Sequence, residues 1–595
     1  MKTLIFYKPK TFLNLKFLTM ADYLDFFQEH FADQDSEFSD SDFEGFEEED
    51  IVEREEQEEE DPFENWIDGD GQKEILNFSG RKGLLVEMDV ESTPMDYINK
   101  LIGDVECNEI AVETNRYADQ LIAAKQPLPP YSRFKKWKPT TGPEIMRFIA
   151  IIMAMGIVNQ SNITDYWSRD PVCETPFFPS IMNRDRFLNL ISCLHLANNE
   201  LYVSRGQPGY NPLFKLGTVY STVLARYPLL FGPNQELSID EGKVPWRGNL
   251  HFKVYHKNKP VKYGLQAYML CDASTGYCLK FHLYTGKTFR QNILETGHGR
   301  TYDLCMHLLK GYFGKGHIMY CDNYYSSPRL FVDLWELGVG ALGTVRSNRK
   351  GIPASIREKH LPNRGDTFSQ HTGQLSITKY LDSKPVFLLS TTLTSEKMYT
   401  GKKNPVTQEL ISKPKMVIAY DKFMGGVDRA DQMVSNSRSK IRTMKWWKKV
   451  FFHVLSLTVL NSYIAYKHNS IHPMSHSSFH KKLVSQLIES HPLDALVTPV
   501  SGRPKTQFLE RLTARHFPSK IPNDGKSKSL QCVVCNPAVA QMLASQGLPK
   551  KRRPGHETAF KCRQCDVSLC IVPCFELYHT MQDYILAYKR LQAEE

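Results

Sequence analysis

Four short segments decide the fold of this chain: ELSID (236–240), KYGLQAYMLCD (262–272), YCLKFHLYTG (277–286) and GHIMYCD (316–322). Each is rich in β-branched and aromatic residues and is bounded by turn residues, a pattern that predicts a strand. Residues 273–276 predict a hairpin turn between the second strand and the third. PRLFVDLWELG (328–338) predicts a helix that ends at Gly338. Strands and a helix in this order indicate an α/β core.

Apolar residues at helical spacing flank this core on both sides. They predict helices in PEIMRFIAIIMAMGI (143–157) and RDRFLNLISCLHLAN (184–198) before it. GGVDRADQMV (425–434) and KWWKKVFFHVLSLTVLNSYIAYKH (445–468) predict further helices after it. Residues 345–415, between core and helices, are rich in turn residues and short strand-like pieces. Because 595 residues exceed what one hydrophobic core serves, we expect three or four domains.

Composition is that of a globular protein without a membrane span. Apolar residues make up 41% and charged residues 24% of the chain, which is ordinary for a soluble protein, and no run of eighteen apolar residues occurs. Residues 1–20 are apolar and basic, but lysines and a proline interrupt them and no small-residue cleavage site follows. We therefore expect no secretory signal and a functional start near Met20, with Met1 as the alternative.

Charge is divided unevenly along the chain. The net charge is +8, yet residues 21–70 contain 23 Asp and Glu and a single basic residue, so this region carries −22 and the remainder carries +30 by difference. The acidic region is poor in aliphatic side chains, so we expect it to be disordered. An acidic tail on a basic body is typical of nucleic-acid-binding proteins, the alternative being a merely solvated surface.

Two aspartates end predicted strands and a third begins a later helix. Asp240 closes the first strand segment, Asp322 closes the last, and Asp428 starts the helix at 425–434, with Asp431 one turn later. A carboxylate at the edge of a core is costly unless a cation compensates it. Mg²⁺ or Mn²⁺ suits such oxygen ligands, and a pair of these ions can drive phosphodiester cleavage. The alternative is that these aspartates only cap turns and helices.

Cysteines cluster at the C-terminal end. Six of the thirteen fall within residues 532–574, as Cys532-x2-Cys535, Cys562-x2-Cys565 and Cys570-x3-Cys574, and His579 follows. Paired cysteines at these spacings predict Zn²⁺ ligation in a reducing compartment. A segment this short cannot fold on its own core, so the metal would hold it together. It could serve DNA binding or only stabilise the C-terminus.

Two segments concentrate positive charge. RSKIRTMKWWKKV (438–450) predicts phosphate contacts by its cations, or else an amphipathic helix with both tryptophans in a core. The cations are Arg438, Lys440, Arg442, Lys445, Lys448 and Lys449. KKRR, which is Lys550, Lys551, Arg552 and Arg553, predicts nuclear import, the alternative being a solvated basic surface.

Five segments in order closely resemble the piggyBac-family transposases: LSIDEGKVPWRG (237–248), KPVKYGLQAYMLCDASTGY (259–277), YCDNYYSS (320–327), GTVRSNRKGIP (343–353) and KFMGGVDRADQM (422–433). CDVSLCIVPCFELYHT (565–580) resembles the family's cysteine-rich end. The resemblance implies an RNase H-like catalytic domain with a DDD triad at Asp240, Asp322 and Asp428, which binds Mg²⁺ or Mn²⁺. Asp431 matches a further family aspartate to which we assign no role.

The resemblance also implies an organisation of the chain. The fold class is α/β, with an RNase H-like core, a β-rich insertion, a split all-helical dimerisation and DNA-binding domain, an acidic disordered N-terminus and a zinc-binding C-terminal domain. The expected ranges are 1–90 for the acidic region, 91–235 and 438–510 for the helical domain, 236–344 and 415–437 for the catalytic domain, 345–414 for the insertion, 511–529 for a linker and 530–585 for the zinc domain.

Family members cut transposon ends, form a hairpin at each end and join the ends at TTAA sites. The resemblance therefore implies a nuclear DNA transposase that works as a homodimer on double-stranded DNA with terminal repeats, without membrane association. The intact triad permits activity, and a domesticated DNA-binding protein without cleavage is the alternative. A plain RNase H-like nuclease is disfavoured, because it needs neither the five ordered motifs nor the cysteine-rich end.

The family's interleaved zinc arrangement implies two ions. Cys532 and Cys535 would share one with Cys570 and Cys574. Cys562 and Cys565 would share the other with His579, and His556 could supply the missing ligand. The chain departs from the family prototype in the spacing at Cys574 and His579, so the pairing stays open.

Overall fold

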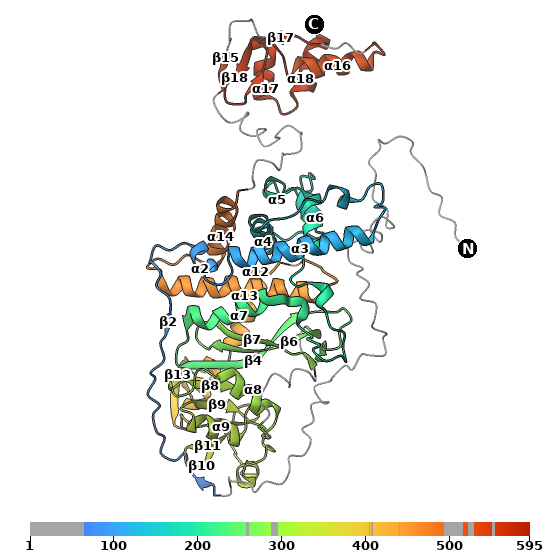
Figure 1. Ribbon diagram of the computed structural model, residues 1–595. Coiled ribbons are helices and arrows are strands. Elements are labelled where there is room, and N and C mark those ends of the chain that lie inside the picture. The colour runs from blue at the N-terminus through green and yellow to red at the C-terminus, as the bar shows by residue number, and fades with distance from the viewer. Residues whose placement is uncertain are drawn as a thin grey trace, which may run out of the picture. The chain divides into compact units, whose positions relative to one another are not determined.

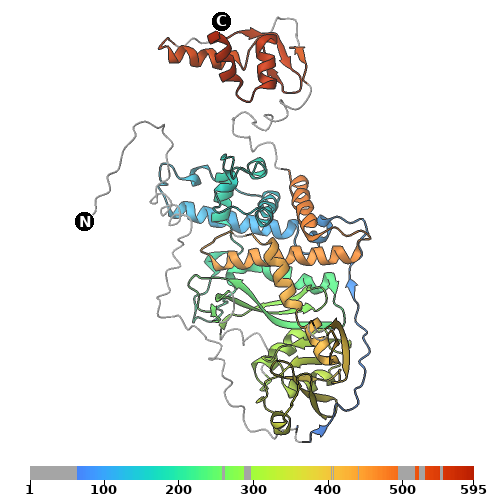
Figure 2. The same cartoon turned by 180° about the vertical axis from the view of Figure 1, so that it is seen from behind.

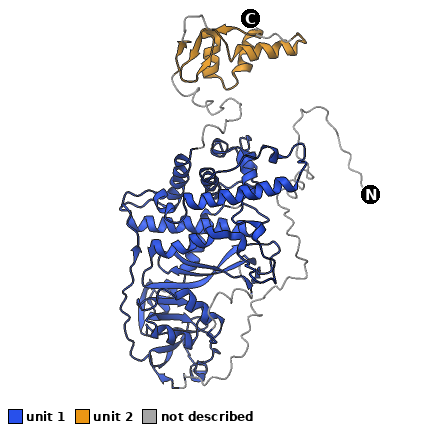
Figure 3. Ribbon diagram, in the orientation of Figure 1, with its two compact units in different colours: residues 1–493 blue, residues 494–595 orange. Residues whose placement is uncertain are grey.

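The computed structural model describes residues 63, 65–257, 261–286, 296–403, 405, 408–439, 441–492, 516–521, 529–549 and 554–594. The chain forms two compact units, residues 1–493 and 494–595 (Figure 3). Several predicted features lie outside the described residues: most of the acidic region, Lys440, most of the linker at 511–529 and the basic run at 550–553. No helix among the described residues is long and apolar enough to cross a membrane.

A mixed sheet of ten described strands forms the centre of unit 1, which confirms the α/β class. Its order is β1-β10-β11-β12-β9-β8-β4-β6-β5, and β7 pairs with β6. The pairs β4–β8 and β8–β9 are parallel and the others antiparallel. The strands are β1 Ile67–Asp68, β4 Glu236–Pro245, β5 Val254–Tyr255, β6 Tyr263–Asp272, β7 Cys278–Leu283, β8 Ile318–Cys321, β9 Gly340–Thr344, β10 Thr367–Thr372, β11 Leu375–Leu381 and β12 Pro385–Ser390.

The hairpin predicted at 273–276 joins β6 to β7. Asp272 Oδ1 accepts hydrogen bonds from the backbone N–H groups of Ser274 (3.1 Å) and Thr275 (2.7 Å). Gly276 has φ +79°, a conformation that side chains with a Cβ rarely adopt. The turn chemistry of this tetrapeptide therefore suffices to close the hairpin.

Strand β4 is longer than the sequence predicts. We expected it to end at Asp240, but it continues to Pro245 because β6 pairs with it along its whole length. Residues 241–245 alternate between half-buried and buried positions, which is the period of a strand. Asp240 thus lies in the middle of β4 and not at its end, at the first position beyond the parallel ladder with β8.

The predicted insertion at 345–414 contributes to the same sheet. Strand β12 pairs with β9 through Leu389 and Gly343, and β10 and β11 follow as the next strands. Strands β13 (Lys397–Lys403) and β14 (Leu410–Pro414) form a separate two-stranded ribbon. The predicted boundary at residue 344 therefore falls inside a continuous sheet.

Helices from distant parts of the chain pack together beside the sheet. Helix α13 contacts α2 and α7, and α14 contacts α4, so helices from before and after the sheet segments lie together (Figures 1 and 2). The apolar spacing correctly predicts α4, α6 and α13. The helices are α2 Pro94–Asn99, α3 Asp104–Ala124, α4 Gly142–Ile157, α6 Arg184–Cys193, α7 Gly217–Leu230, α13 Trp446–Asn469 and α14 His476–Ser490.

Five shorter helices among the described residues accompany the sheet. They are α8 Arg300–Leu309, α9 Pro328–Glu336, α10 Ala354–Glu358, α11 Lys415–Phe423 and α12 Gly426–Ser437. Ser327 caps the start of α9 by accepting the N–H of Leu330, and Gly338 follows its end with φ +70°. This matches the helix predicted at 328–338.

Residues 65–90 are part of the folded unit 1, although we predicted disorder up to residue 90. Strand β1 pairs with β10, and β2 (Gly83–Leu84) pairs with β3 (Phe231–Gly232). The N–H of Ser79 donates to the carbonyl of Lys315 at 3.0 Å. Backbone hydrogen bonds hold much of this segment, and composition cannot reveal such bonds.

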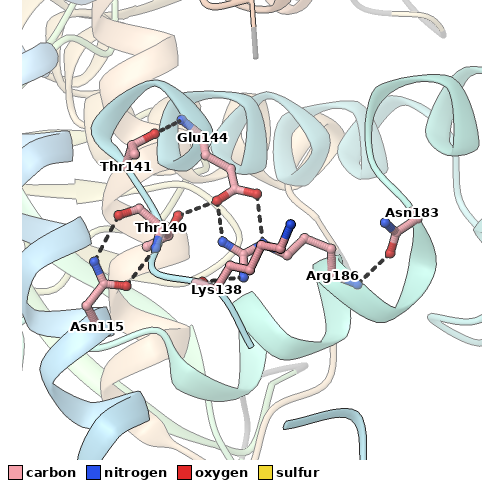
Figure 4. A network of polar contacts seen from close by, with 7 residues as sticks. All are labelled: Asn115, Lys138, Thr140, Thr141, Glu144, Asn183 and Arg186. Atoms are coloured by element: carbon pink, nitrogen blue, oxygen red, sulfur yellow. Dashed lines mark hydrogen bonds and ion pairs between the residues drawn. The ribbon is translucent and has the colours of Figure 1, made fainter. Parts of the chain in front are cut away.

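A polar network ties α3, α4 and α6 together (Figure 4). Arg186 donates from Nε to Glu144 Oε1 at 2.8 Å and from Nη2 to Oε2 at 2.5 Å. Thr140 Oγ1 also donates to Glu144 Oε2, and Asn115 bonds the backbone of Thr140 in both directions. Both side chains of the ion pair are largely buried, at 16% and 8% exposed. Each of its charges therefore depends on the other.

Arg186→Leu is expected to destabilise unit 1 by about 3 kcal/mol, because it leaves the buried Glu144 carboxylate without its cation. The matched control on the same helix is Arg184→Leu, which removes an ion pair with Asp185 that is more than half exposed. That change should cost less than about 1 kcal/mol. Urea titration of the three proteins measures the difference, and equal midpoints for the two variants would contradict the prediction.

Unit 2 is small and rich in cysteine. Its described core contains five buried cysteines and six other buried hydrophobic residues, among them Val534, Leu569 and Tyr578, and the partly buried Cys570 packs against it. Its elements are β15 Pro518–Lys520, β16 Leu530–Gln531, α16 Cys535–Ser545, β17 Glu557–Thr558, β18 Phe560–Cys562, β19 Val567–Ser568, α17 Glu576–Thr580 and α18 Tyr584–Glu594. A core this limited predicts dependence on a further stabilising element.

Candidate catalytic and metal sites

Asp240 lies on β4, and Asp322 directly follows the end of the neighbouring strand β8, at the same level of the sheet. The parallel register pairs Ile239 of β4 with Cys321, the last residue of β8, and each aspartate is the next residue along the chain. Both side chains are half-buried. The sheet therefore brings together two carboxylates that are 82 positions apart in the sequence.

Hydrogen bonds fix the chain around each of these carboxylates. Asp322 Oδ1 accepts the N–H of Tyr324 at 2.9 Å, and the Asp322 carbonyl accepts the Ser326 hydroxyl at 3.0 Å. Asp240 Oδ1 accepts the N–H of Glu241 at 2.8 Å. Asp322 thus belongs to a tight turn that leads into α9.

Helix α12, which carries the third aspartate, is held against β4. Ser238 Oγ donates to the carbonyl of Met424 at 2.6 Å. A Cβ at Gly426 would lie 2.9 Å from Ser238 Cβ and 3.0 Å from Ala273 Cα, so only glycine allows this approach. The GG sequence that opens the motif therefore has a packing role.

The two aspartates of α12 differ in their surroundings. Asp428, the residue predicted for the triad, is exposed in the first turn of the helix. Asp431 is half-buried, and its Oδ1 lies 3.6 Å from the position that a Cβ at Gly242 would take. Gly242 and Asp240 share one face of β4 because side chains alternate along a strand. Asp431 therefore faces the Asp240 side of the strand.

Two further side chains border the aspartates. Tyr420 of α11 is half-buried; burial raises its pKa to about 12, with contributions from nearby Cys321, Asp322 and Asp240. Arg349 Nη2 donates to the carbonyls of Asn323 and Tyr324 at 3.0 Å each. The neutral phenol of Tyr420 and a turn held by hydrogen bonds from Arg349 thus lie beside the carboxylates. The sequence analysis did not single out either residue, since neither has a diagnostic spacing.

The basic segment at 438–450 is more buried than predicted. Lys448 is 5% exposed and donates to the carbonyls of Ile191 (2.8 Å) and Ser192 (2.9 Å). Burial lowers the pKa of Lys449 to about 8, and burial also lowers the pKa of Arg438. Trp447 is buried, whereas Arg442 is exposed. Lys448 is therefore packed inside the protein, as the alternative of an amphipathic helix with a buried face expects. Among the described members of the six predicted phosphate contacts, Arg442 is the one that is exposed.

Four thiols form the first metal-binding group in unit 2: Cys532, Cys535, Cys570 and Cys574. Their sulfur atoms lie within 4.8 Å of one another. A tetrahedral Zn²⁺ with Zn–S bonds of 2.3 Å places its sulfurs about 3.8 Å apart, so the group fits this ion. This is the pairing that the resemblance implies.

Electrostatics in this group favour a bound cation. A hydrogen bond from Cys574 lowers the pKa of Cys532 to about 5, whereas burial and the neighbouring thiols raise that of Cys570 to about 12. Four ionised sulfurs at this distance repel one another, and a divalent cation removes the penalty. The N–H groups of Cys570 and His556 also point at the sulfurs of Cys532 (3.4 Å) and Cys535 (3.3 Å).

The second group contains Cys562, Cys565, His579 and His516, again within 4.8 Å. Cys562 ends β18, and Cys565 lies in the turn between β18 and β19. His579 Nδ1 lies 2.7 Å from the carbonyl of Phe575, which leaves Nε2 to face Cys565 Sγ at 3.7 Å. Such a second hydrogen bond orients a ligand histidine.

His516, and not His556, completes the second group. His516 Nδ1 lies 3.3 Å from Cys562 Sγ and 3.4 Å from Cys565 Sγ. The His556 side chain is exposed, and its backbone bonds the first group. The sequence analysis missed His516 because it stands 46 residues before Cys562 without a partner at ligand spacing. Pairing of β15 with β18 brings it into place.

Among the described residues, these two groups of unit 2 are the ones in which at least three His, Cys, Asp or Glu side chains bring their ligand atoms within 4.8 Å of one another. Asp240, Asp322 and Asp428 do not form a group this tight. The neighbouring positions of Asp240 and Asp322 nevertheless provide oxygen donors of the kind that Mg²⁺ takes, and this ion completes its shell with water.

Comparison with known proteins agrees with these observations. The family model for Transposase IS4 matches residues 93–463. The human PiggyBac transposable element-derived protein 3 is 26% identical over 456 residues, which cover 74% of this chain and 70% of that protein. The human PiggyBac transposable element-derived protein 2 is 25% identical over 386 residues, 63% of this chain and 61% of that protein.

A solved structure shares the fold. It is a cryo-EM structure of a piggyBac transposase synaptic complex with hairpin DNA, with a TM-score of 0.63 and 22% identity over 82% of this chain and 97% of that chain. At this identity the likeness establishes the fold. The family model spans more than half of the chain and includes the sheet, Asp240, Asp322 and α12. The chain therefore belongs to the Transposase IS4 family, in its piggyBac type.

Proposed function

We propose that this chain is a metal-dependent DNA transposase that cleaves and rejoins strands with Asp240, Asp322 and an aspartate of α12. The observation that carries the proposal is the register of β4 and β8, which holds two carboxylates side by side under a helix that brings a third. When bound there, Mg²⁺ or Mn²⁺ would activate a water or 3′-hydroxyl and stabilise the leaving oxygen.

The protein's own contribution is to hold the carboxylates in fixed positions. Asp240 is fixed on a strand paired to β6, and Asp322 is fixed in a hydrogen-bonded turn. Asp428 is the motif residue of α12, while Asp431 faces β4. We propose Asp428 as the third ligand and Asp431 as a residue that supports it or shares in binding. Arg349 would keep the Asp322 turn in place while DNA binds.

The partner in this proposal is double-stranded DNA with terminal repeats, joined at TTAA. Support comes from the charge of +30 outside the acidic region and from the structural relative, whose title describes a complex with hairpin DNA. We propose that the protein acts in the nucleus as a homodimer, one protomer for each transposon end. Lys550–Arg553, outside the described residues, are the proposed import signal.

Zinc in unit 2 completes the proposal. Cys532, Cys535, Cys570 and Cys574 would bind one Zn²⁺, and Cys562, Cys565, His579 and His516 a second. We propose that the folded module contributes to binding of transposon ends. Deletion of residues 530–595 would then weaken specific end binding.

Excision in cells tests the proposed function. The protein is expressed with a marker flanked by matching terminal repeats and TTAA, and Asp322→Asn serves as the matched control. Excision that restores TTAA, and that drops to background with Asp322→Asn because a metal ligand is lost, is the expected result. Sequencing of the repaired sites measures it.

A DNA-binding protein without strand cleavage is the second candidate. It is favoured by one observation: the similar human proteins are described as derived from transposable elements. Absence of excision by the unsubstituted protein, together with retained binding to the repeats, would replace the first proposal with this one.

A further inference from the structure

A buried tyrosine connects β4, which carries Asp240, to the turn that carries Asp322. Tyr325, 1% exposed, donates its hydroxyl to Glu241 Oε1. Glu241 follows Asp240 on β4, and its side chain points to the opposite face of the strand because side chains alternate. Tyr325 lies three residues after Asp322 in the turn that leads to α9. The pair therefore bridges β4 and the Asp322 turn on the side away from Asp240.

The bridge links the carboxylate of Asp240 to the backbone of Asp322. The Glu241 N–H donates to Asp240 Oδ1 at 2.8 Å, and the Tyr325 N–H donates to the Asp322 carbonyl at 3.3 Å. The register pairs of β4 with β8 end at Ile239 and Cys321, just before the two aspartates. The Tyr325–Glu241 contact thus continues the connection between the strands beyond the last ladder position.

A connection of this kind controls distance. Two ligands on separate strands can share a metal only if their separation is held close to the value that the ion requires. Hydrogen bonds behind ligand residues typically change metal affinity 10- to 100-fold when they are removed. Because Tyr325 is buried, its hydroxyl cannot exchange this partner for bulk water.

We infer that Glu241 and Tyr325 are positioning residues that set the separation of Asp240 and Asp322 for a divalent metal ion. The inference rests on the proposed function, since it assumes that this carboxylate pair binds metal. Neither Glu241 nor Tyr325 binds the metal ion in this inference. Both act by holding the segments that carry Asp240 and Asp322 at a fixed separation.

Mn²⁺ binding to the zinc-loaded full-length protein, measured by electron paramagnetic resonance without DNA, tests the inference. Tyr325→Phe removes only the hydroxyl, and we expect it to weaken the Mn²⁺ affinity about tenfold. Glu241→Gln keeps an oxygen acceptor, so its affinity should stay within about twofold of the unsubstituted protein. Asp240→Asn defines the signal that comes from other sites.

The matched control is Tyr302→Phe. Tyr302 is also buried and donates to a carboxylate, Asp333 Oδ2 at 2.6 Å, but this pair connects α8 and α9 and not the strands of the aspartates. Its Mn²⁺ affinity should not change. The double variant Tyr325→Phe with Glu241→Leu also removes the carboxylate that has lost its Tyr325 donor and should recover stability, while the affinity stays low.

Three outcomes overturn the inference in distinguishable ways. If the unsubstituted protein binds Mn²⁺ through Asp240 and Tyr325→Phe binds it equally well, the positioning role is wrong and the proposed function stands. If the unsubstituted protein shows no Mn²⁺ binding that Asp240→Asn abolishes, the proposed function fails and this inference fails with it. Recovery of affinity in the double variant would also overturn it, because the loss would then reflect stability alone.

Discussion

Chelation of zinc from the full-length protein is expected to unfold the described elements of unit 2, from β15 to α18, and to leave unit 1 folded. The described core of unit 2 has eleven buried residues, of which five are cysteines and four are Leu or Tyr. A core of this size supplies roughly 3–5 kcal/mol at most, whereas structural Zn²⁺ contributes about 10–16 kcal/mol of binding free energy in small zinc modules. Loss of the ions should therefore exceed the whole stability of the unit.

Hydrogen exchange with and without a zinc chelator measures this effect. Amides of α16 and α18 should become unprotected, while those of α13 in unit 1 should not change. Elemental analysis should find two zinc ions in each chain. Protection of unit 2 that survives complete zinc removal would show that its apolar contacts suffice.

The same measurement separates the two candidate ligand histidines. His516→Ala should lower the zinc content to about one ion and expose the 562–565 turn, because His516 lies within 3.4 Å of both thiols there. His556→Ala should keep two ions, since its side chain is exposed. Cys173→Ser, at a half-buried cysteine of unit 1 outside both groups, serves as a further control.

Asp240→Asn is expected to lower DNA strand cleavage by about 10³-fold and to leave DNA affinity within about twofold. Loss of one carboxylate from a metal site removes several kcal/mol of transition-state stabilisation, and about 4 kcal/mol corresponds to 10³ in rate. Asparagine preserves size and strand pairing, so the fold should persist. Single-turnover cleavage of labelled terminal-repeat DNA in Mg²⁺ measures the rate.

Two comparisons sharpen this experiment. Asp421→Asn alters an exposed aspartate of α11 that pairs with Lys413 at the surface, and it should cleave normally. Asp428→Asn and Asp431→Asn report which aspartate of α12 takes part. An unchanged rate for Asp240→Asn would rule out the proposed carboxylate site, whatever the behaviour of α12.

Much of the local structure follows from the sequence because it depends on neighbouring residues. Apolar periodicity correctly predicted α4, α6 and α13, and the turn residues at 273–276 correctly predicted the β6–β7 hairpin. The cysteine spacings predicted the pairs Cys532–Cys535 and Cys562–Cys565, each of which lies at a short turn. The predicted end of β4 at Asp240 was wrong because β6 pairs far beyond that residue, and strand length depends on the partner.

The sequence by itself determined the family, the strands and helices of the core, and the residue types that suit magnesium and zinc. Only the tertiary structure decided which of these residues meet: Asp240 beside Asp322, Asp431 toward β4, His516 at the second thiol pair, and Lys448 in a packed helix. The reason is physical. Periodicity and turn chemistry act over a few residues, whereas ligand groups and buried charges depend on contacts between segments that only sheet pairing and helix packing bring together.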